Sequence, residues 1–188
     1  PLIEATRTKA LGLMHKQIVK DSSICRQGLP DYLITMRKPG DNSEPIAHPD
    51  GLTSFAGENE PDIPKDKIEY SHHVWRRYAS PVWMDINQTN TLQKESAREN
   101  KDERHICPLQ LDVIERALTL WSNPGDIILS PFAGIGSEGY VAVKMDRRFI
   151  GIELKESYWK CSVNNLKMAE LENRQGTLFE FLEKKEGE

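Results

Sequence analysis

The sequence predicts an α/β fold built on a parallel sheet, because strand-like and helix-like segments alternate regularly in its last third. Two short apolar segments, at residues 126–129 and 149–152, have the length of buried strands. A glycine-rich turn and a helical segment at 136–145 lie between them. Because a helical crossover joins parallel strands, we expect one sheet with helices on both of its faces.

The flanking elements follow from apolar spacing and from chain breakers. Residues 5–19 and 108–121 repeat apolar side chains at helical spacing, and Asn123-Pro124-Gly125 ends the second of these helices. Residues 32–36 are predicted as a short buried strand, and residues 155–171 as the last helix. Residues 39–72 are rich in proline and glycine with little periodicity, and residues 87–104 are polar and charged, so we expect a loop-rich insertion over residues 39–104.

Length and composition limit the kinds of protein that this chain can be. The 188 residues suit one domain with an insertion, and no segment reaches the length and apolar character of a membrane span. The net charge of −4 is uneven, since residues 1–38 carry seven basic and three acidic side chains and the chain ends in an acidic tail. Three widely spaced cysteines favour a reducing cytoplasm, and the adjacent His72 and His73 make a poor metal pair, so no metal is expected.

The turn after the first strand carries the clearest functional signal. Gly134, Gly136 and Gly139 satisfy G-x-G-x-x-G between a strand and a helix. Such glycines allow a tight turn, let a ligand approach the backbone, and let the helix pack closely on the sheet. Glu153 ends the next strand, 19 residues after Gly134, where a carboxylate can accept hydrogen bonds from the ribose of an adenosine.

Three ligands compete for this turn. A nucleoside triphosphate requires a lysine and a serine or threonine after the last glycine, but Tyr140 and Val141 stand there. A dinucleotide requires a second mononucleotide-binding half, and too little chain follows Glu153 for one. S-adenosylmethionine requires one glycine loop and one ribose acid, which suits the length available. The alternative is an ordinary tight turn that binds nothing.

Residues 104–165 resemble the cofactor half of the bacterial and phage DNA amino-methyltransferases that modify adenine N6 or cytosine N4. The resemblance rests on 107–112 (CPLQLD), Gly125-Asp126, 130–137 (SPFAGIGS) and 147–154 (RRFIGIEL), in the family's order and spacing. It implies a Rossmann-like S-adenosylmethionine-dependent methyltransferase fold with a partial sheet. It also implies a permuted order, in which a catalytic half and a target-recognition region precede the cofactor half.

The resemblance implies the following organisation and site. Residues 1–38 end the catalytic half, 39–104 hold part of the recognition region, 105–175 form the cofactor half, and 176–188 are an acidic tail. The residues expected at S-adenosylmethionine are Cys107, Pro108, Leu109, Gln110, Ser130, Pro131, Phe132, Ala133, Gly134, Gly136, Ser137 and Glu153.

The sequence departs from the family at the catalytic motif. The family's Asp/Asn/Ser-Pro-Pro-aromatic element, which presents oxygens to the target amino group of a flipped base, has no clear counterpart. Ser80-Pro81-Val82-Trp83 is a weak candidate, with Ser80, Pro81 and Trp83 in the matching positions, and the alternative is a turn that anchors Trp83. Ser130 and Leu111 also replace the family's acid and lysine. We therefore expect a C-terminal portion that is inactive alone and needs an N-terminal catalytic half.

DNA is the expected substrate, with adenine N6 favoured over cytosine N4. Arg76 and Arg77, which lie between Trp75 and Tyr78, and Lys38 are the candidate DNA contacts. Two rival functions remain open: a catalytically inactive module that binds an adenosine ligand or DNA, and a fragment of a nicotinamide-dependent oxidoreductase.

Overall fold

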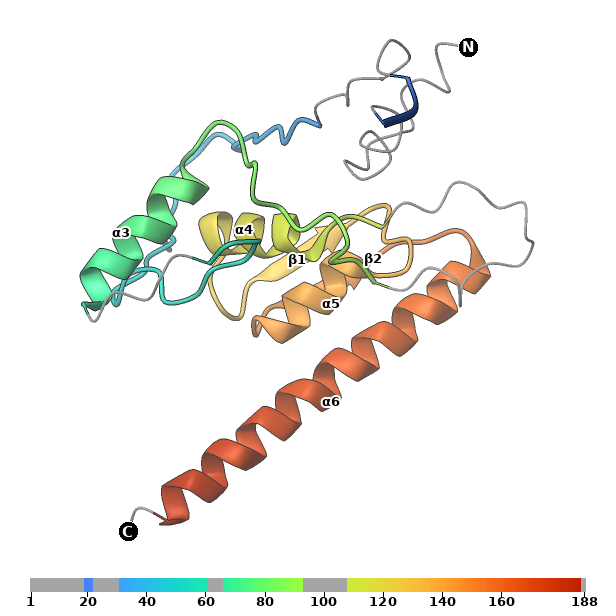
Figure 1. The fold of residues 1–188 in the computed structure, drawn as a ribbon. Helices are drawn as coiled ribbons and strands as arrows, with labels where there is room; N and C mark the ends of the chain where they lie inside the picture. Colours follow the sequence, from blue (N-terminus) through green and yellow to red (C-terminus); the bar gives the residue numbers. More distant parts are fainter. Residues whose placement is uncertain (1–18, 22–30, 61–65, 93–107, 187–188) are drawn as a thin grey trace. The chain divides into compact units, whose positions relative to one another are not determined.

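The computed structural model describes residues 19–21, 31–60, 66–92 and 108–186, with side chains up to residue 174 (Figure 1). The chain divides into two units, residues 1–44 and 45–188. In the first unit, residues 31–44 have no helix or strand, and their side chains are exposed. The helix predicted at residues 5–19 lies almost entirely outside the described residues.

The strand predicted at residues 32–36 is wrong. These residues belong to no strand, and Tyr32, Ile34 and Met36 are each more than three-quarters exposed. A strand needs a neighbour that pairs with its N–H and C=O groups. Among the described residues, strand pairing joins only the two strands of the second unit.

The predicted strand–helix–strand unit is confirmed in the second unit. Strand β1 (Ile127–Ser130) runs parallel to β2 (Arg148–Gly151), with Ile128 paired to Phe149, and helix α5 (Ser137–Lys144) connects them. Helix α4 (Leu111–Trp121) precedes β1, and α6 (Glu156–Glu186) follows β2. Helix α6 continues 15 residues beyond the predicted end at Leu171, through a segment rich in helix-forming glutamate, leucine and lysine.

One face of the sheet is covered by helices. Ile128 and Phe149 pack against a core of buried side chains from α4 and α5: Ile114, Leu118, Val141 and Ala142. The alternate side chains Ile127, Leu129 and Ile150 point the other way and are 53%, 61% and 52% exposed. Within the described part of the chain, the expected covering by helices is therefore found on one face.

Helix α3 (Lys67–Tyr78) lies inside the segment predicted to be loop-rich. The side chain of Asp66 caps its start by accepting the N–H of Ile68 at 2.8 Å. Tyr70, Val74 and Tyr78 form its buried side together with Leu52, and Leu120 of α4 packs against them. Residues 67–78 are therefore a folded part of the second unit. No described helix is long and apolar enough to cross a membrane.

Candidate functional site

The glycine loop joins the end of β1 to the start of α5. Gly134 and Gly136 have φ angles of 54° and 84°, which side chains disfavour, and the N–H of Gly136 donates to the carbonyl of Ala133 at 2.7 Å. A Cβ on Gly136 would collide with Ser162 of α6, whereas a Cβ on Gly134 would meet no atom within 4 Å. The backbone at Gly134 is therefore open to a ligand, while Gly136 is backed by α6.

Gly139 fulfils the role predicted for the third glycine. A Cβ there would lie 2.5 Å from the ring of Phe149 in β2. Only a residue without a side chain allows α5 to approach the strand this closely. This contact fixes the start of α5, and hence the glycine loop, against the sheet.

Glu153 lies beside the open glycine. Its carboxylate accepts the N–H of Gly134 at 2.8 Å through Oε2 and the N–H of Lys155 at 2.9 Å through Oε1. Each carboxylate oxygen can accept a further hydrogen bond. The structure thus brings the predicted ribose acid and the predicted glycine loop together, with acceptor capacity left over on the acid.

Some of the other predicted cofactor residues are buried and others are exposed to solvent. Ser130, Ala133 and Ser137 are buried in the turn, and the N–H of Ala133 donates to the carbonyl of Ile152 at 2.9 Å, which ties the turn to the end of β2. Phe132 is 86% exposed and Pro131 is exposed. Pro108, Leu109 and Gln110 lie directly before α4, and Cys107 lies outside the described residues.

Glu138 is the only charged residue between positions 130 and 143. Burial raises the pKa of the Glu138 carboxyl, in the first turn of α5, while a backbone hydrogen bond opposes this shift. Residues 130–143 contain no lysine or arginine. The loop therefore offers backbone groups and a nearby carboxylate to a ligand, without a basic side chain for a phosphate.

A second segment, residues 85–92, reaches this loop, and the sequence alone does not predict its position. Leu92 packs against the buried cluster formed by Ile135 of the glycine loop and Cys161 of α6, and Tyr158 packs against the same cluster. The residues just before it, 87–90, are hydrogen-bonded to the start of α4. The sequence between positions 85 and 92 contains no motif, so only the long-range contacts reveal its place.

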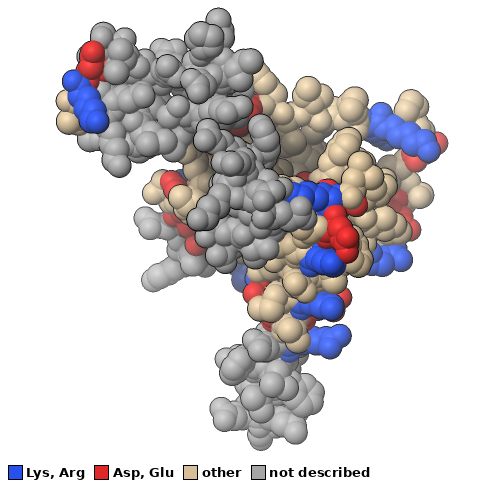
Figure 2. Space-filling view, turned by 90° about the vertical axis from the view of Figure 1, so that its right-hand side faces the viewer, with Lys and Arg blue, Asp and Glu red and all other residues tan. Residues whose placement is uncertain are grey.

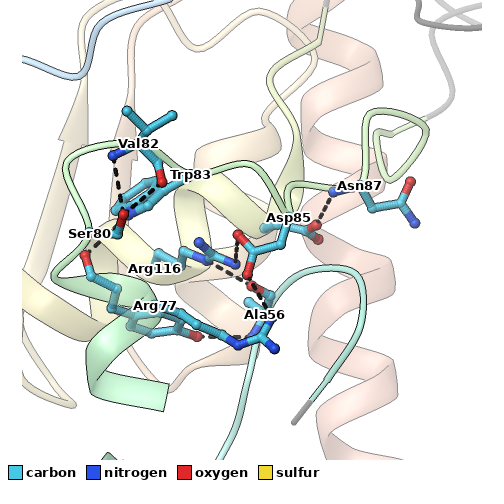
Figure 3. A network of polar contacts seen from close by, with 10 residues as sticks. Ala56, Arg77, Ser80, Val82, Trp83, Asp85, Asn87 and Arg116 are labelled. Atoms are coloured by element: carbon cyan, nitrogen blue, oxygen red, sulfur yellow. Dashed lines mark hydrogen bonds and ion pairs between the residues drawn. The ribbon is translucent and has the colours of Figure 1, made fainter. Parts of the chain in front are cut away.

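The first residue of this segment, Asp85, pairs with a buried arginine of α4 (Figure 3). Arg116 of α4 is fully buried, its Nε donates to the carbonyl of Ala56 at 2.8 Å, and its Nη2 lies 2.9 Å from Oδ1 of Asp85. The Nη2–Oδ1 contact is an ion pair without hydrogen-bond geometry. The guanidinium carbon lies 4.9–5.2 Å from the ring centres of Phe55, Tyr78 and Trp83, so aromatic faces supply the rest of its surroundings.

The weak catalytic candidate has the contacts of an anchoring turn. The Ser80 hydroxyl donates to the carbonyl of Val82 at 2.9 Å, and the Trp83 indole N–H donates to the carbonyl of Tyr78 at 3.1 Å (Figure 3). The guanidinium group of Arg116 also lies over the Trp83 ring. These contacts favour the alternative interpretation, in which the turn holds Trp83 in place.

The candidate DNA contacts are in different surroundings. Arg77 lies 3.3 Å from Asp85 and over the Phe55 ring, whereas Arg76 is exposed next to Trp75, which is 54% exposed. Lys38 is exposed in the first unit. On the face shown in Figure 2, basic and acidic side chains are interspersed.

A family model described as DNA methylase, of the N6/N4 type, matches residues 29–164. The DNA adenine methyltransferase YhdJ of Escherichia coli K12 is 44% identical over 67 residues, which are 36% of this chain and 23% of that protein. The type II methyltransferase M1.MboII of Moraxella bovis is 43% identical over 54 residues, 29% of this chain and 21% of that protein. The matches thus span less than a quarter of these curated relatives.

Solved structures show weaker likeness. The S-adenosyl-L-methionine complex of TTHA0409 from Thermus thermophilus is 22% identical, with a TM-score of 0.44, and the match covers 75% of this chain and 48% of that one. The M1.HpyAVI–SAM complex is 31% identical with a TM-score of 0.32, over 38% of this chain and 35% of that one. The family match, which covers most of the chain, confirms the resemblance seen in the sequence, and S-adenosylmethionine is the cofactor of that family. The chain belongs to the N6/N4 DNA methylase family.

Proposed function

We propose that this chain binds S-adenosylmethionine at the glycine loop, as the cofactor half of a DNA amino-methyltransferase. The observation that carries the proposal is the pairing of Glu153 with an open backbone at Gly134. Glu153 would accept hydrogen bonds from the ribose hydroxyls, and the backbone at Gly134 and Gly136 would lie against the cofactor. Residues 108–110, ahead of α4, would close over the methionine end.

Ser130, Pro131, Phe132, Ala133 and Ser137 belong to the same turn and would line the cofactor there. Cys107, which precedes residues 108–110, is proposed to act with them at the methionine end. When bound, the cofactor supplies an electrophilic methyl group. The chain's own contribution is to hold the donor in one orientation, which lowers the entropic cost of the reaction.

The charge of the loop supports a donor without phosphates. Residues 130–143 hold one carboxylate, Glu138, and no basic side chain. A pyrophosphate would gain from the N-terminus of α5 but would face Glu138 and Glu153, with no basic side chain in residues 130–143 to compensate. S-adenosylmethionine carries a sulfonium, an ammonium and one carboxylate group, and the same protein carboxylates favour its net positive charge.

The proposed substrate is an exocyclic amine of DNA, with adenine N6 favoured over cytosine N4. The name of the relative YhdJ, a DNA adenine methyltransferase, supports this preference. Arg76 is the better-supported DNA contact because its side chain is exposed beside Trp75, a pairing suited to phosphate and base contact. Arg77 and Lys38 stay proposed contacts, although Asp85 already pairs with Arg77.

We further propose that the catalytic loop is supplied by residues outside this sequence. The 188 residues contain no Pro-Pro pair. The turn at Ser80, Pro81 and Trp83 has structural contacts of its own. A reducing cytoplasm is the proposed location, supported by the wide spacing of the three cysteines.

Calorimetric titration with S-adenosylhomocysteine and with NAD tests the cofactor assignment. S-adenosylhomocysteine is used because it keeps the adenosine and amino-acid parts of the donor but cannot transfer a methyl group. We expect it to bind with one-to-one stoichiometry and NAD to give no heat of binding. Binding of NAD alone would contradict the proposal and favour the oxidoreductase alternative.

A further inference from the structure

The segment 85–92 connects the buried Arg116 to the glycine loop. At its first residue, the Asp85 carboxylate pairs with Arg116, and the Asp85 carbonyl accepts the N–H of Glu58 at 2.6 Å. The position of Asp85 is therefore determined by a fully buried partner on α4 and by the neighbouring turn at Glu58. Because a buried cation needs its counter-ion, this end of the segment cannot easily move.

Hydrogen bonds to the start of α4 hold the middle of the segment. Asp112, only 4% exposed, accepts the backbone N–H of Asn87 at 2.7 Å and the side-chain amide of Asn90 at 2.5 Å. The carbonyl of Asn90 accepts the N–H of Leu111 at 2.8 Å. Both carboxylate oxygens of Asp112 thus accept hydrogen bonds from the segment. Because Asn90 is also bonded to Leu111, the segment is held next to residues 108–110.

The far end of the segment reaches the glycine loop. Leu92 packs against the buried cluster formed by Cys161 and by Ile135, the residue between the two positive-φ glycines. The segment therefore runs from the start of α4 to the glycine loop. These are the two parts of the chain that the proposed function places at the methionine end and at the adenosine end of the cofactor.

We propose that residues 87–92 form a wall of the cofactor site at the amino-acid end, and that Asp112 and Asn90 are its positioning residues. The inference rests on the proposed function, because it assumes that the donor lies between residues 108–110 and the glycine loop. Loss of the Asp112–Asn90 contact would release the wall where it borders α4, while Glu153 and Gly134 would still hold the ribose. The homocysteine part of the ligand should therefore lose affinity and the adenosine part should not.

The test compares two ligands on the full 188-residue chain. Titrations with S-adenosylhomocysteine and with adenosine are made on the native chain, Asn90→Ala and Asp112→Asn. We expect each substitution to weaken S-adenosylhomocysteine binding by about tenfold and to change adenosine binding by less than about twofold. The loss of affinity in the double variant should be smaller than the sum of the two single losses in free energy, because both substitutions act on the Asp112–Asn90 contact.

Asp66→Asn is the matched control. It makes the same chemical change at the cap of α3, where the carboxylate bonds to Ile68, and it should leave both affinities unchanged. Asn90 is exposed, so Asn90→Ala keeps the test available should Asp112→Asn fail to fold. Equal weakening of both ligands, or no weakening of either, would overturn the inference. Absence of S-adenosylhomocysteine binding by the native chain would overturn the proposed function, and this inference with it.

Discussion

Glu153 holds the glycine loop and is also proposed to hold the cofactor. Its Oε2 accepts the N–H of Gly134 at 2.8 Å, so the carboxylate shapes the loop before any ligand arrives. We expect Glu153→Ala to weaken S-adenosylhomocysteine binding at least tenfold, because hydrogen bonds to a charged group contribute roughly 1.5–3 kcal/mol. Titration calorimetry measures the effect.

Glu153→Gln is the matched control for this prediction. Glutamine keeps one oxygen that can accept the N–H of Gly134, but it loses the charge and one acceptor that a ribose diol needs. Its affinity should fall between those of the native chain and Glu153→Ala. Native affinity in Glu153→Ala would show that the ribose lies elsewhere.

The two neighbouring arginines of α3 should respond differently to substitution. Arg76 is exposed, and removal of a phosphate contact should reduce the slope of log affinity against log salt by about 1. Arg77 is paired with Asp85, so Arg77→Ala should lower the stability of the fold and reduce the salt slope by less than Arg76→Ala does. Filter binding to duplex DNA over a range of salt concentrations measures both slopes. A reduced slope in Arg77→Ala alone would reverse the assignment.

At the residue scale, the sequence predicts side chains that belong to a local motif. Gly134, Gly136 and Glu153 can be identified because a strand–turn–helix pattern fixes their neighbours along the chain. Asp85 and Arg116 cannot be identified, because 31 positions separate them and neither belongs to a motif. Their pairing depends on how α3 and α4 pack, which apolar spacing alone does not define.

At the scale of elements, α6 is held to α5 by apolar packing more than by its surface ion pair. Lys144 and Glu172 lie 2.9 Å apart, but both side chains are about 40% exposed, and such pairs contribute under about 1 kcal/mol. Ala169, on the same helix, is fully buried. We expect Ala169→Leu to cost about 1–3 kcal/mol of unfolding free energy by overpacking, and Glu172→Gln much less, in urea denaturation.

The pH dependence of this ion pair has a defined sign. Hydrogen bonds from Lys144 and Tyr140 lower the pKa of the Glu172 carboxyl. A carboxyl with a lowered pKa in the folded state stabilises that state above its unfolded pKa, and the contribution is lost as the pH falls through the folded pKa. Glu172→Gln should therefore cost a small part of the unfolding free energy at pH 7 and nothing once the pH lies below the folded pKa. A cost in urea denaturation that stays equal in acid would mean that Glu172 acts through packing and not through its charge.

Sequence patterns predict elements well where apolar periodicity and breakers coincide. Helix α4, β1, α5 and β2 all begin and end within about three residues of their expected bounds. Helix α3 escapes prediction because the surrounding prolines and glycines suggest a loop, although Tyr70, Val74 and Tyr78 stand at helical spacing behind the Asp66 cap. The apolar run at 32–36 resembles a strand because such runs show β propensity without showing a pairing partner.

For the whole molecule, the exposed face of the sheet and the missing motif point to the same conclusion. Ile127, Leu129 and Ile150 form an uncovered apolar face among the described residues, and apolar sheet faces are normally buried against another layer. The sequence also contains no Pro-Pro-aromatic element to present oxygens to a target amine. Both observations agree with the proposal that this chain holds the methyl donor and that other residues complete the reaction.

This proposal predicts donor binding without methyl transfer. Incubated with S-adenosylmethionine carrying a labelled methyl group, the chain should retain label in equilibrium dialysis and incorporate none into duplex DNA. Glu153→Ala is the control, since it should lose the retained label as well. Because the donor must lie in line with the target amine for transfer, correct donor binding alone cannot accelerate the reaction. Incorporation above the level of Glu153→Ala would show that this chain supplies the catalytic contacts after all, with Ser80, Pro81 and Trp83 the first residues to test.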